Sequence, residues 1–179
     1  MKKLIVSLLV LAGIAVAPSA ASAADNFCEL NVSYGGYTVM DAADYADNWD
    51  HVHTAWGSVN ATMWFNILPN LAVGPSYSFS SAHTDGGPHH SSVGYHSILA
   101  NVKYQYWSNS IVKLYGHAGI GVEISHLMPK YFDSYNNTYF GFQVSPVGAM
   151  VDLTDRFGIY GELGFGCQGL VQVGFKVGF

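Results

Sequence analysis

Apolar side chains alternate with small or polar ones through most of the sequence, and this two-residue period restricts the chain to β-strands. The last segment shows it best: one parity carries Val171, Val173, Phe175, Val177 and Phe179, and the other carries Gln172, Gly174, Lys176 and Gly178. Successive side chains of a strand point to opposite faces, so each such segment has one apolar face. Similar alternation predicts eight strands, the other seven over 27–39, 56–67, 71–81, 95–107, 111–125, 139–151 and 157–166.

The composition indicates what the apolar faces contact. Hydrophobic residues make up 50% of the chain and charged residues only 11%, whereas about a quarter is charged in a soluble domain. No apolar run in 24–179 approaches the roughly 20 residues of a membrane helix. A soluble barrel would turn its Gly-, Ser- and Ala-rich faces to water with few charges, which is unfavourable. We therefore predict an all-β fold, a closed antiparallel eight-stranded transmembrane β-barrel with up-and-down strand order and its apolar faces in lipid.

The first 23 residues have the three parts of a secretory signal peptide. Lys2 and Lys3 give a basic start, residues 4–16 are almost wholly apolar, and Ala21-Ser22-Ala23 is a small-residue cleavage site. We expect cleavage after Ala23, which leaves 24–179 as one barrel domain. That domain carries five Lys and Arg against twelve Asp and Glu, a formal net charge of −7. Such acidity argues against a nucleic acid partner.

The predicted connections alternate in length. Residues 68–70, 108–110 and 152–156 are tight and rich in turn-forming residues, whereas long polar segments cover 40–55, 82–94 and 126–138. Short periplasmic turns opposite longer outer loops are typical of outer-membrane barrels. The fourth outer connection, around Gln168, is short. An even number of strands then places both termini on the periplasmic side.

The end of the chain carries a recognisable spacing. Gln172, Gly174, Val177 and the terminal Phe179 resemble the assembly signal of bacterial outer-membrane barrels: polar, any, Gly, any two, hydrophobic, any, aromatic. Over 27–179 the strand pattern, loop asymmetry and last strand resemble the small OmpA/OmpX-type barrels. The resemblance implies a Gram-negative outer membrane, insertion by the barrel assembly machinery, and outer-membrane lipid and lipopolysaccharide as neighbours. It implies no single biochemical activity.

Charged residues also occupy positions of lumen parity. These comprise three acids and three bases, namely Glu29, Glu123, Glu162, Lys103, Lys113 and Lys176. Because an unpaired buried charge costs several kcal/mol, we predict that they form ion pairs in a packed lumen. Glu29 and Lys176 lie on the two strands that close the barrel, and we expect them to be close. A charged pathway for small ions is the alternative, but an eight-stranded lumen is only wide enough to be filled by side chains.

Histidines are concentrated in or beside the predicted outer loops. They are His51, His53, His83, His89, His90 and His126. His51 and His53 could share a metal ion, yet polar loop residues in contact with solvent or lipopolysaccharide are the favoured interpretation. We predict no metal site and no cofactor.

A lipid-modifying enzyme is a sharper alternative, because Ser91 and Ser92 each follow a histidine by two residues. A serine nucleophile needs an adjacent base and an acid to orient that base. The nearest later acid, Glu123, has lumen parity, whereas such a triad would have to face the membrane. We therefore predict no catalytic site.

Aromatic residues and the two cysteines complete the predicted map. Aromatic side chains near strand ends predict two interfacial girdles, one from Trp64, Tyr104, Tyr106, Trp107, Phe157 and Phe179 and the other from Tyr77, Phe79, Phe140 and Phe142. Cys28 and Cys167 fall near opposite ends of the barrel. A disulfide requires Cα atoms within about 7 Å, so two free thiols are expected.

Taken together, these features favour a monomeric, surface-exposed structural or interaction protein, similar in role to an adhesin. Its activity would lie in the outer loops, where an extracellular ligand would bind, or in the membrane itself. A lipid A- or phospholipid-modifying enzyme and a narrow porin-like channel remain as alternatives.

Overall fold

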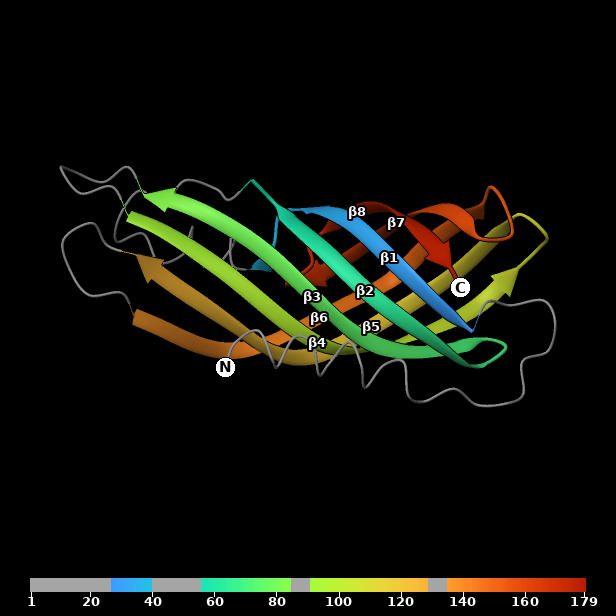
Figure 1. The fold of residues 1–179 in the computed structure, drawn as a ribbon, viewed down its shortest axis with the longest axis horizontal. Helices are drawn as coiled ribbons and strands as arrows, with labels where there is room; N and C mark the ends of the chain where they lie inside the picture. Colours follow the sequence, from blue (N-terminus) through green and yellow to red (C-terminus); the bar gives the residue numbers. More distant parts are fainter. Residues whose placement is uncertain (1–26, 40–55, 85–90, 129–134) are drawn as a thin grey trace.

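The structure is a closed barrel of eight antiparallel strands (Figure 1). It is a computed structural model that describes residues 27–39, 56–84, 91–128 and 135–179. The strands are β1 (Cys28–Gly36), β2 (Ser58–Leu68), β3 (Leu71–Thr84), β4 (Ser91–Ser108), β5 (Val112–Met128), β6 (Tyr135–Asp152), β7 (Phe157–Gly166) and β8 (Val171–Gly178). No helix in the described part of the chain is long and apolar enough to cross a membrane.

Each strand pairs with its neighbour in sequence, and β8 returns to pair with β1. Glu29 lies opposite Gly178, and Gly36 lies opposite Val171. The backbone N–H of Phe179 donates to the carbonyl of Cys28 at 2.8 Å, so the last residue continues the closing ladder. The predicted fold, strand number and up-and-down order are confirmed.

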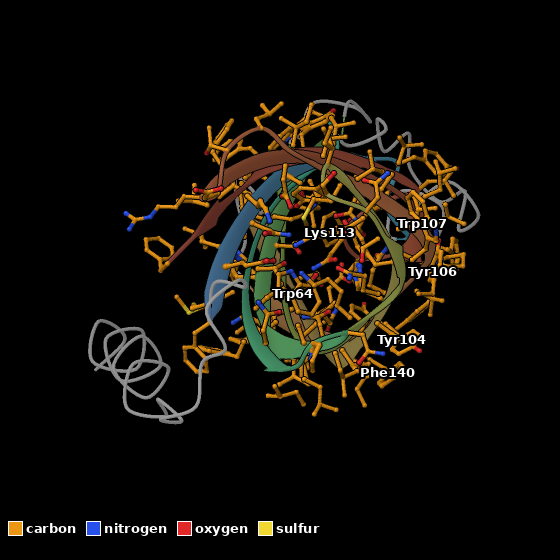
Figure 2. All side chains as sticks on the ribbon, turned by 90° about the vertical axis from the view of Figure 1, so that its right-hand side faces the viewer. Trp64, Tyr104, Tyr106, Trp107, Lys113 and Phe140 are labelled. Atoms are coloured by element: carbon orange, nitrogen blue, oxygen red, sulfur yellow. The ribbon has the colours of Figure 1, made fainter. Side chains whose placement is uncertain are left out.

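The predicted division of faces is confirmed along the regular strands. On β2, for example, Ser58, Asn60, Thr62 and Trp64 are buried in the lumen while Val59 is 43% exposed. Exposed apolar side chains cover the outside of the barrel, where Ile120 and Phe140 reach 64% and 70% exposure. Figure 2 shows Phe140 outside the wall and Lys113 inside it.

The strands β3 to β6 are longer than the alternation predicted. Residues 82–84, 91–94, 126–128 and 135–138 were expected in outer loops but belong to these strands. A bilayer needs only about 9–11 residues of a tilted strand, whereas β4 and β6 have 18 each. The additional residues extend past the apolar band, where neither face of a strand has to be apolar. Apolar–polar alternation therefore underestimates the length of these strands.

A bulge in β6 changes the parity of that strand. Gln143 and Ser145 face the lumen, and after Pro146 and Val147 the buried positions become Gly148 and Met150. The registers with both neighbouring strands shift at this point. Proline has no N–H for a ladder and is tolerated in sheets at bulges. After the bulge the even-numbered residues, such as Gly148 and Met150, face the lumen. The single alternating segment predicted over 139–151 does not include this change of parity.

Most of the predicted aromatic girdle lies outside the barrel, but Trp64 does not. Tyr104, Tyr106 and Trp107 are each about half exposed, whereas Trp64 is 2% exposed and lies within the lumen (Figure 2). The parity of β2 already placed Trp64 inward, and its position near a strand end was the misleading signal. The girdle prediction was therefore wrong for Trp64.

Substituting lysine on the outer face tests whether that face lies in lipid. Lys at Ile120, midway along the apolar part of β5, is expected to lower the free energy of unfolding by about 2–4 kcal/mol, and Lys at Ile111 in the β4–β5 turn by only about 0–1 kcal/mol. Urea unfolding of the barrel in phospholipid vesicles, followed by tryptophan fluorescence, measures both. Equal costs at the two positions would contradict a lipid-facing outer surface.

Candidate functional site: the charged lumen

Five charged side chains form a continuous chain of ion pairs inside one end of the barrel. Lys103 Nζ lies 2.8 Å from Glu29 Oε2, and Lys176 Nζ lies 3.6 Å from Glu29 Oε1. Lys176 also contacts Asp152 Oδ1 at 2.6 Å, and Lys113 contacts Asp152 Oδ2 at 3.3 Å. These residues come from five different strands, so the chain of ion pairs links β4, β1, β8, β6 and β5 across the lumen.

Lys176 is the central member of this chain. Its side chain is 3% exposed and contacts both acids, whereas the side chain of Lys113 is 21% exposed. Taking charges out of water is costly, and mutual attraction in the interior compensates only when every charge has a partner. Lys103 gains further contacts, because its Nζ lies 5.0 Å from the ring centre of Trp64 and 5.7 Å from that of Tyr115.

A second polar cluster surrounds Glu162 on β7. The hydroxyl of Tyr115 donates to Oε1 at 2.7 Å, and the amide of Gln172 donates to Oε2 at 3.4 Å. Nδ1 of His117 lies 2.8 Å from Oε2, although without the angle of a hydrogen bond, so this contact is an ion pair only when the ring is protonated. The rings of His117 and Trp64 pack in a T-shaped arrangement, with 5.7 Å between ring centres.

The turn between β7 and β8 fills the lumen nearer the other end. Gln168 in this turn is 2% exposed. Its carbonyl accepts from Ser58 Oγ and Asn60 Nδ2 at 2.9 and 3.0 Å, and its side-chain amide donates to Ser76 Oγ at 2.9 Å. A Cβ at Gly35 would lie 1.8 Å from the Gln168 carbonyl oxygen. The turn can therefore enter the lumen only because residue 35 is glycine.

The six predicted lumen charges fall into three groups. Glu29, Lys103, Lys113 and Lys176 are connected through the ion-pair chain, and the expected proximity of Glu29 and Lys176 is present. Glu162 pairs with His117 rather than with a lysine. Glu123 forms a side-chain hydrogen bond with Cys167. The expected pairing of three acids with three lysines is therefore wrong for Glu162.

Two members of these clusters, Asp152 and His117, are not among the predicted site residues. Asp152 was assigned to a turn because the bulge at Pro146 hid its inward parity. His117 has lumen parity in the strand predicted over 111–125, but the predicted ion pairs include lysines as the only bases. In an acidic chain with few lysines, an inward histidine beside an inward acid is the signal that could have found this pair.

The remaining predicted chemical features are only partly within the described residues. Cys28 and Cys167 are both free, as expected. No group of three metal-ligating side chains is found within 27–39, 56–84, 91–128 and 135–179, and His51, His53, His89 and His90 lie outside these ranges. The assembly signal forms most of β8, where Gln172 faces the lumen; its role in assembly stays a prediction.

Comparison with known proteins agrees with the geometry. The family described as "Outer membrane protein beta-barrel domain" matches residues 6–166. The N-terminal β-barrel domain of Pseudomonas aeruginosa OprF is 10% identical, with a TM-score of 0.50, over 87% of this chain and 98% of that one. Ail, the attachment invasion locus protein of Yersinia pestis, is 14% identical, with a TM-score of 0.50, over 85% and 94%. A search of curated protein sequences finds no significant match.

Removing the central lysine tests the ion-pair chain. Lys176→Met leaves the buried carboxylate of Glu29 and the half-buried carboxylate of Asp152 with one partner each. It is expected to lower the free energy of unfolding by about 3–5 kcal/mol. Lys113→Met removes the half-buried end of the chain and should cost no more than about 1 kcal/mol. Urea unfolding in vesicles gives both values. An equal loss of stability for Lys113→Met and Lys176→Met would show that the ion-pair chain has no buried centre.

Proposed function

Because the chain belongs to the outer membrane protein β-barrel domain family, we propose that it is an integral protein of a Gram-negative outer membrane. Residues 1–23 direct export and are removed, and the barrel assembly machinery inserts 24–179 through the signal that ends at Phe179. The exposed apolar residues of the wall, such as Ile120 and Phe140, then contact lipid. Both termini lie on the periplasmic side, and the β7–β8 turn lies toward the outer side.

Within this proposal the protein acts at the cell surface, as a structural or interaction protein similar in role to an adhesin. The filled lumen is the observation that carries it. The ion-pair chain around Lys176 occupies one end, and the Gln168 turn fills the lumen nearer the other end. An interior packed in this way favours neither transport nor a reaction inside the barrel, so the outer connections are the part of the monomer left to contact a partner.

The charge of the outer connections favours a cationic or cation-bridged partner. They contain Asp41, Asp44, Asp47, Asp50, Asp85 and Asp133 and a single basic residue, Lys130. The structure of Ail was determined with a heparin analogue, sucrose octasulfate, and a polysulfated ligand of that kind would be repelled here. Positively charged surfaces, or anionic surfaces bridged by divalent cations, are the better match.

Location is tested by fractionation of cells that express the full chain. We expect the protein to be found in the outer-membrane fraction, to begin at Ala24 by mass spectrometry, and to migrate differently on gels with and without heating. A closed barrel resists detergent at room temperature, which produces the migration difference. A heat-insensitive protein in the soluble periplasmic fraction would overturn the proposal.

Surface activity is tested by comparing a deletion strain with strains that express charge-neutralised variants. Replacing Asp41, Asp44, Asp47 and Asp50 with Asn is expected to reduce adhesion of cells to a polylysine-coated surface, because those carboxylates lie in an outer connection. Asp155→Asn, in the periplasmic β6–β7 turn, is the control and should leave adhesion unchanged.

Uptake of a small chromogenic antibiotic, measured in the same strains, separates the alternatives. Adhesion that depends on the four aspartates, with unchanged uptake, supports a surface interaction protein. Uptake that falls on deletion of the gene would indicate a channel and would overturn the proposed role. Altered lipid A mass in the deletion strain would do the same in favour of a lipid-modifying enzyme.

A further inference from the structure

The outer face of β3 to β6 changes character along the strands. Cross-strand partners define rows, and the row Tyr77–Ile98–Val122–Phe140 is apolar or aromatic. Two residues further toward the outer ends the row is Phe79–His96–Ile124–Thr138, and the next is Ser81–Gly94–His126–Asn136. The apolar band therefore ends at His96, and polar side chains continue above it. We call His96, His126, Asn136 and Ser81 the histidine rim.

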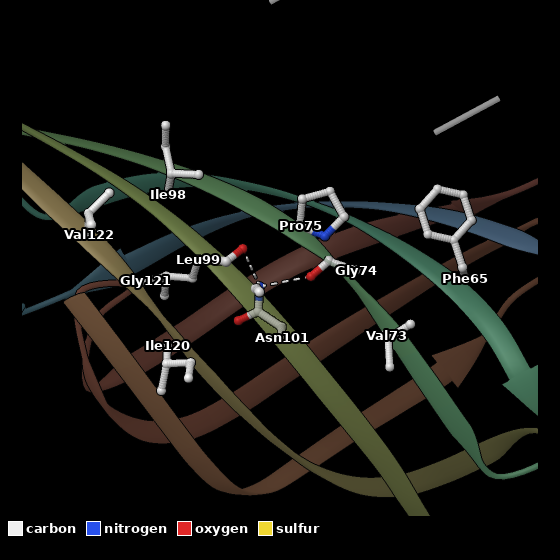
Figure 3. A pocket seen from close by; sticks show the side chains of 11 residues that line it. Phe65, Val73, Gly74, Pro75, Ile98, Leu99, Asn101, Ile120, Gly121 and Val122 are labelled. Carbon is white, nitrogen blue, oxygen red and sulfur yellow. Dashed lines mark hydrogen bonds between the residues drawn. The ribbon is translucent and has the colours of Figure 1, made fainter. Parts of the chain in front are cut away.

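An open groove of about 600 Å³ lies directly below the histidine rim (Figure 3). Ala100 is at its centre, with Pro75 and Ile120 on the neighbouring strands and Ile98 and Val122 on the side of the rim. The groove is open along the outside of the wall rather than enclosed, so an occupant would lie along the wall instead of being surrounded by it. The groove exists because Ala100 has a short side chain between larger neighbours.

The floor of the groove is fixed from the lumen side. The ladder between β2 and β3 is interrupted between the pairs Thr62–Ser76 and Phe65–Val73. Pro75 lies in this gap and has no backbone N–H to donate. The amide of Asn101, inside the barrel, donates to the carbonyls of Gly74 and Leu99 at 3.2 Å each (Figure 3). These bonds hold the backbone beneath the groove, so the groove is a preformed feature of the wall.

The two histidines of the rim are oriented by neighbouring side chains. The hydroxyl of Tyr77 lies 2.7 Å from Nδ1 of His96, and the carbonyl oxygen of Asn136 contacts Nδ1 of His126. When Tyr77 donates its proton, the neutral ring of His96 carries its own proton on Nε2. That nitrogen lies over Gly94, which is buried: a Cβ at Gly94 would lie 3.7 Å from Nε2 of His96 and 3.9 Å from Cε2 of Phe79.

A hydrocarbon groove on its own would select nothing in a membrane. Lipid tails are as apolar as the groove, so an acyl chain gains only packing when it leaves the bulk lipid. Selectivity must therefore come from the rim, where imidazole N–H groups can donate to an anion at low local dielectric. The rim spans four strands, or about 14 Å, which exceeds a single glycerophosphate and suits a phosphorylated disaccharide with several polar groups.

We propose that the groove and the histidine rim form a binding site for one phosphorylated glycolipid of the outer leaflet. One acyl chain lies along Ala100, and a headgroup phosphate accepts a hydrogen bond from Nε2 of His96. His126 donates its Nδ1 proton to Asn136, so it adds a second donor at Nε2 only when its ring is protonated. The proposal rests on the proposed outer-membrane location, since only that location places the rim at the level of such headgroups.

Native mass spectrometry of the refolded chain in detergent tests the acyl-chain part, with phosphorylated lipid A as the probe. Ala100→Leu fills the groove and is expected to weaken lipid A binding about tenfold, equivalent to about 1.4 kcal/mol. Ala118→Leu makes the same change at another exposed alanine, on β5 outside the groove, and should bind as the wild type does. Equal binding by both variants, or an equal loss in both, would overturn the site.

The headgroup part is tested with His96→Phe, which keeps a ring against Phe79 (5.1 Å between ring centres in the wild type). The wild type should prefer phosphorylated over dephosphorylated lipid A, and over phosphatidylglycerol, by about tenfold. The variant should bind all three alike. Inorganic phosphate in excess should not displace the lipid; displacement would show that the rim binds free phosphate and would overturn a lipid site.

Folding and location are followed separately from lipid binding. Each variant is used only with the heat-dependent gel shift of the wild type, so lost binding cannot be lost structure. If the chain fractionates to the outer membrane but Ala100→Leu binds lipid A normally, this inference alone fails. If the chain is absent from that membrane, the proposed location fails whatever the micelle measurements show.

Discussion

Closure of the β-sheet is the constraint on which the rest of the structure depends. In hydrocarbon each backbone N–H and C=O needs a partner within the protein, and only a closed barrel gives strands that partner on both sides. The pairing of β8 with β1, continued by the Phe179 N–H, closes the sheet. Closure with eight strands also fixes a narrow interior, where inward charged and polar side chains need partners from the protein itself.

The lumen meets this demand in two physically different ways. At one end, long lysine side chains from opposite walls meet Glu29 and Asp152, so charge neutralisation fills the space. Toward the other end β7, β8 and β1 are short, and the Gln168 turn enters with neutral hydrogen bonds to Ser58, Asn60 and Ser76. Glycine at position 35 permits this entry. Because β7, β8 and β1 are short, the turn that joins β7 to β8 can enter the lumen and fill it.

The architecture could be predicted from the sequence because its signal is repeated in every strand, whereas the site depends on single departures from that signal. Alternation identified the lumen positions of Glu29, Lys103 and Lys176 without any structure. It missed Asp152, because one proline at position 146 reversed the parity of the last third of β6. Which inward charges meet depends on the stagger of strands far apart in the chain, and a two-residue period carries no information about it.

The unequal strand lengths also determine where the outer surface can be specific. Strands β3 to β6 continue beyond the apolar band, so their outer faces present a boundary between hydrocarbon and polar groups on rigid, paired backbone. Side chains held on strands lose less conformational freedom on binding than side chains on long connections, and this lowers the cost of ligand capture. His96, oriented by Tyr77 above the Ala100 groove, is such a preorganised position. Within this proposal, the histidine rim and the groove below it contact the membrane more selectively than the rest of the apolar band.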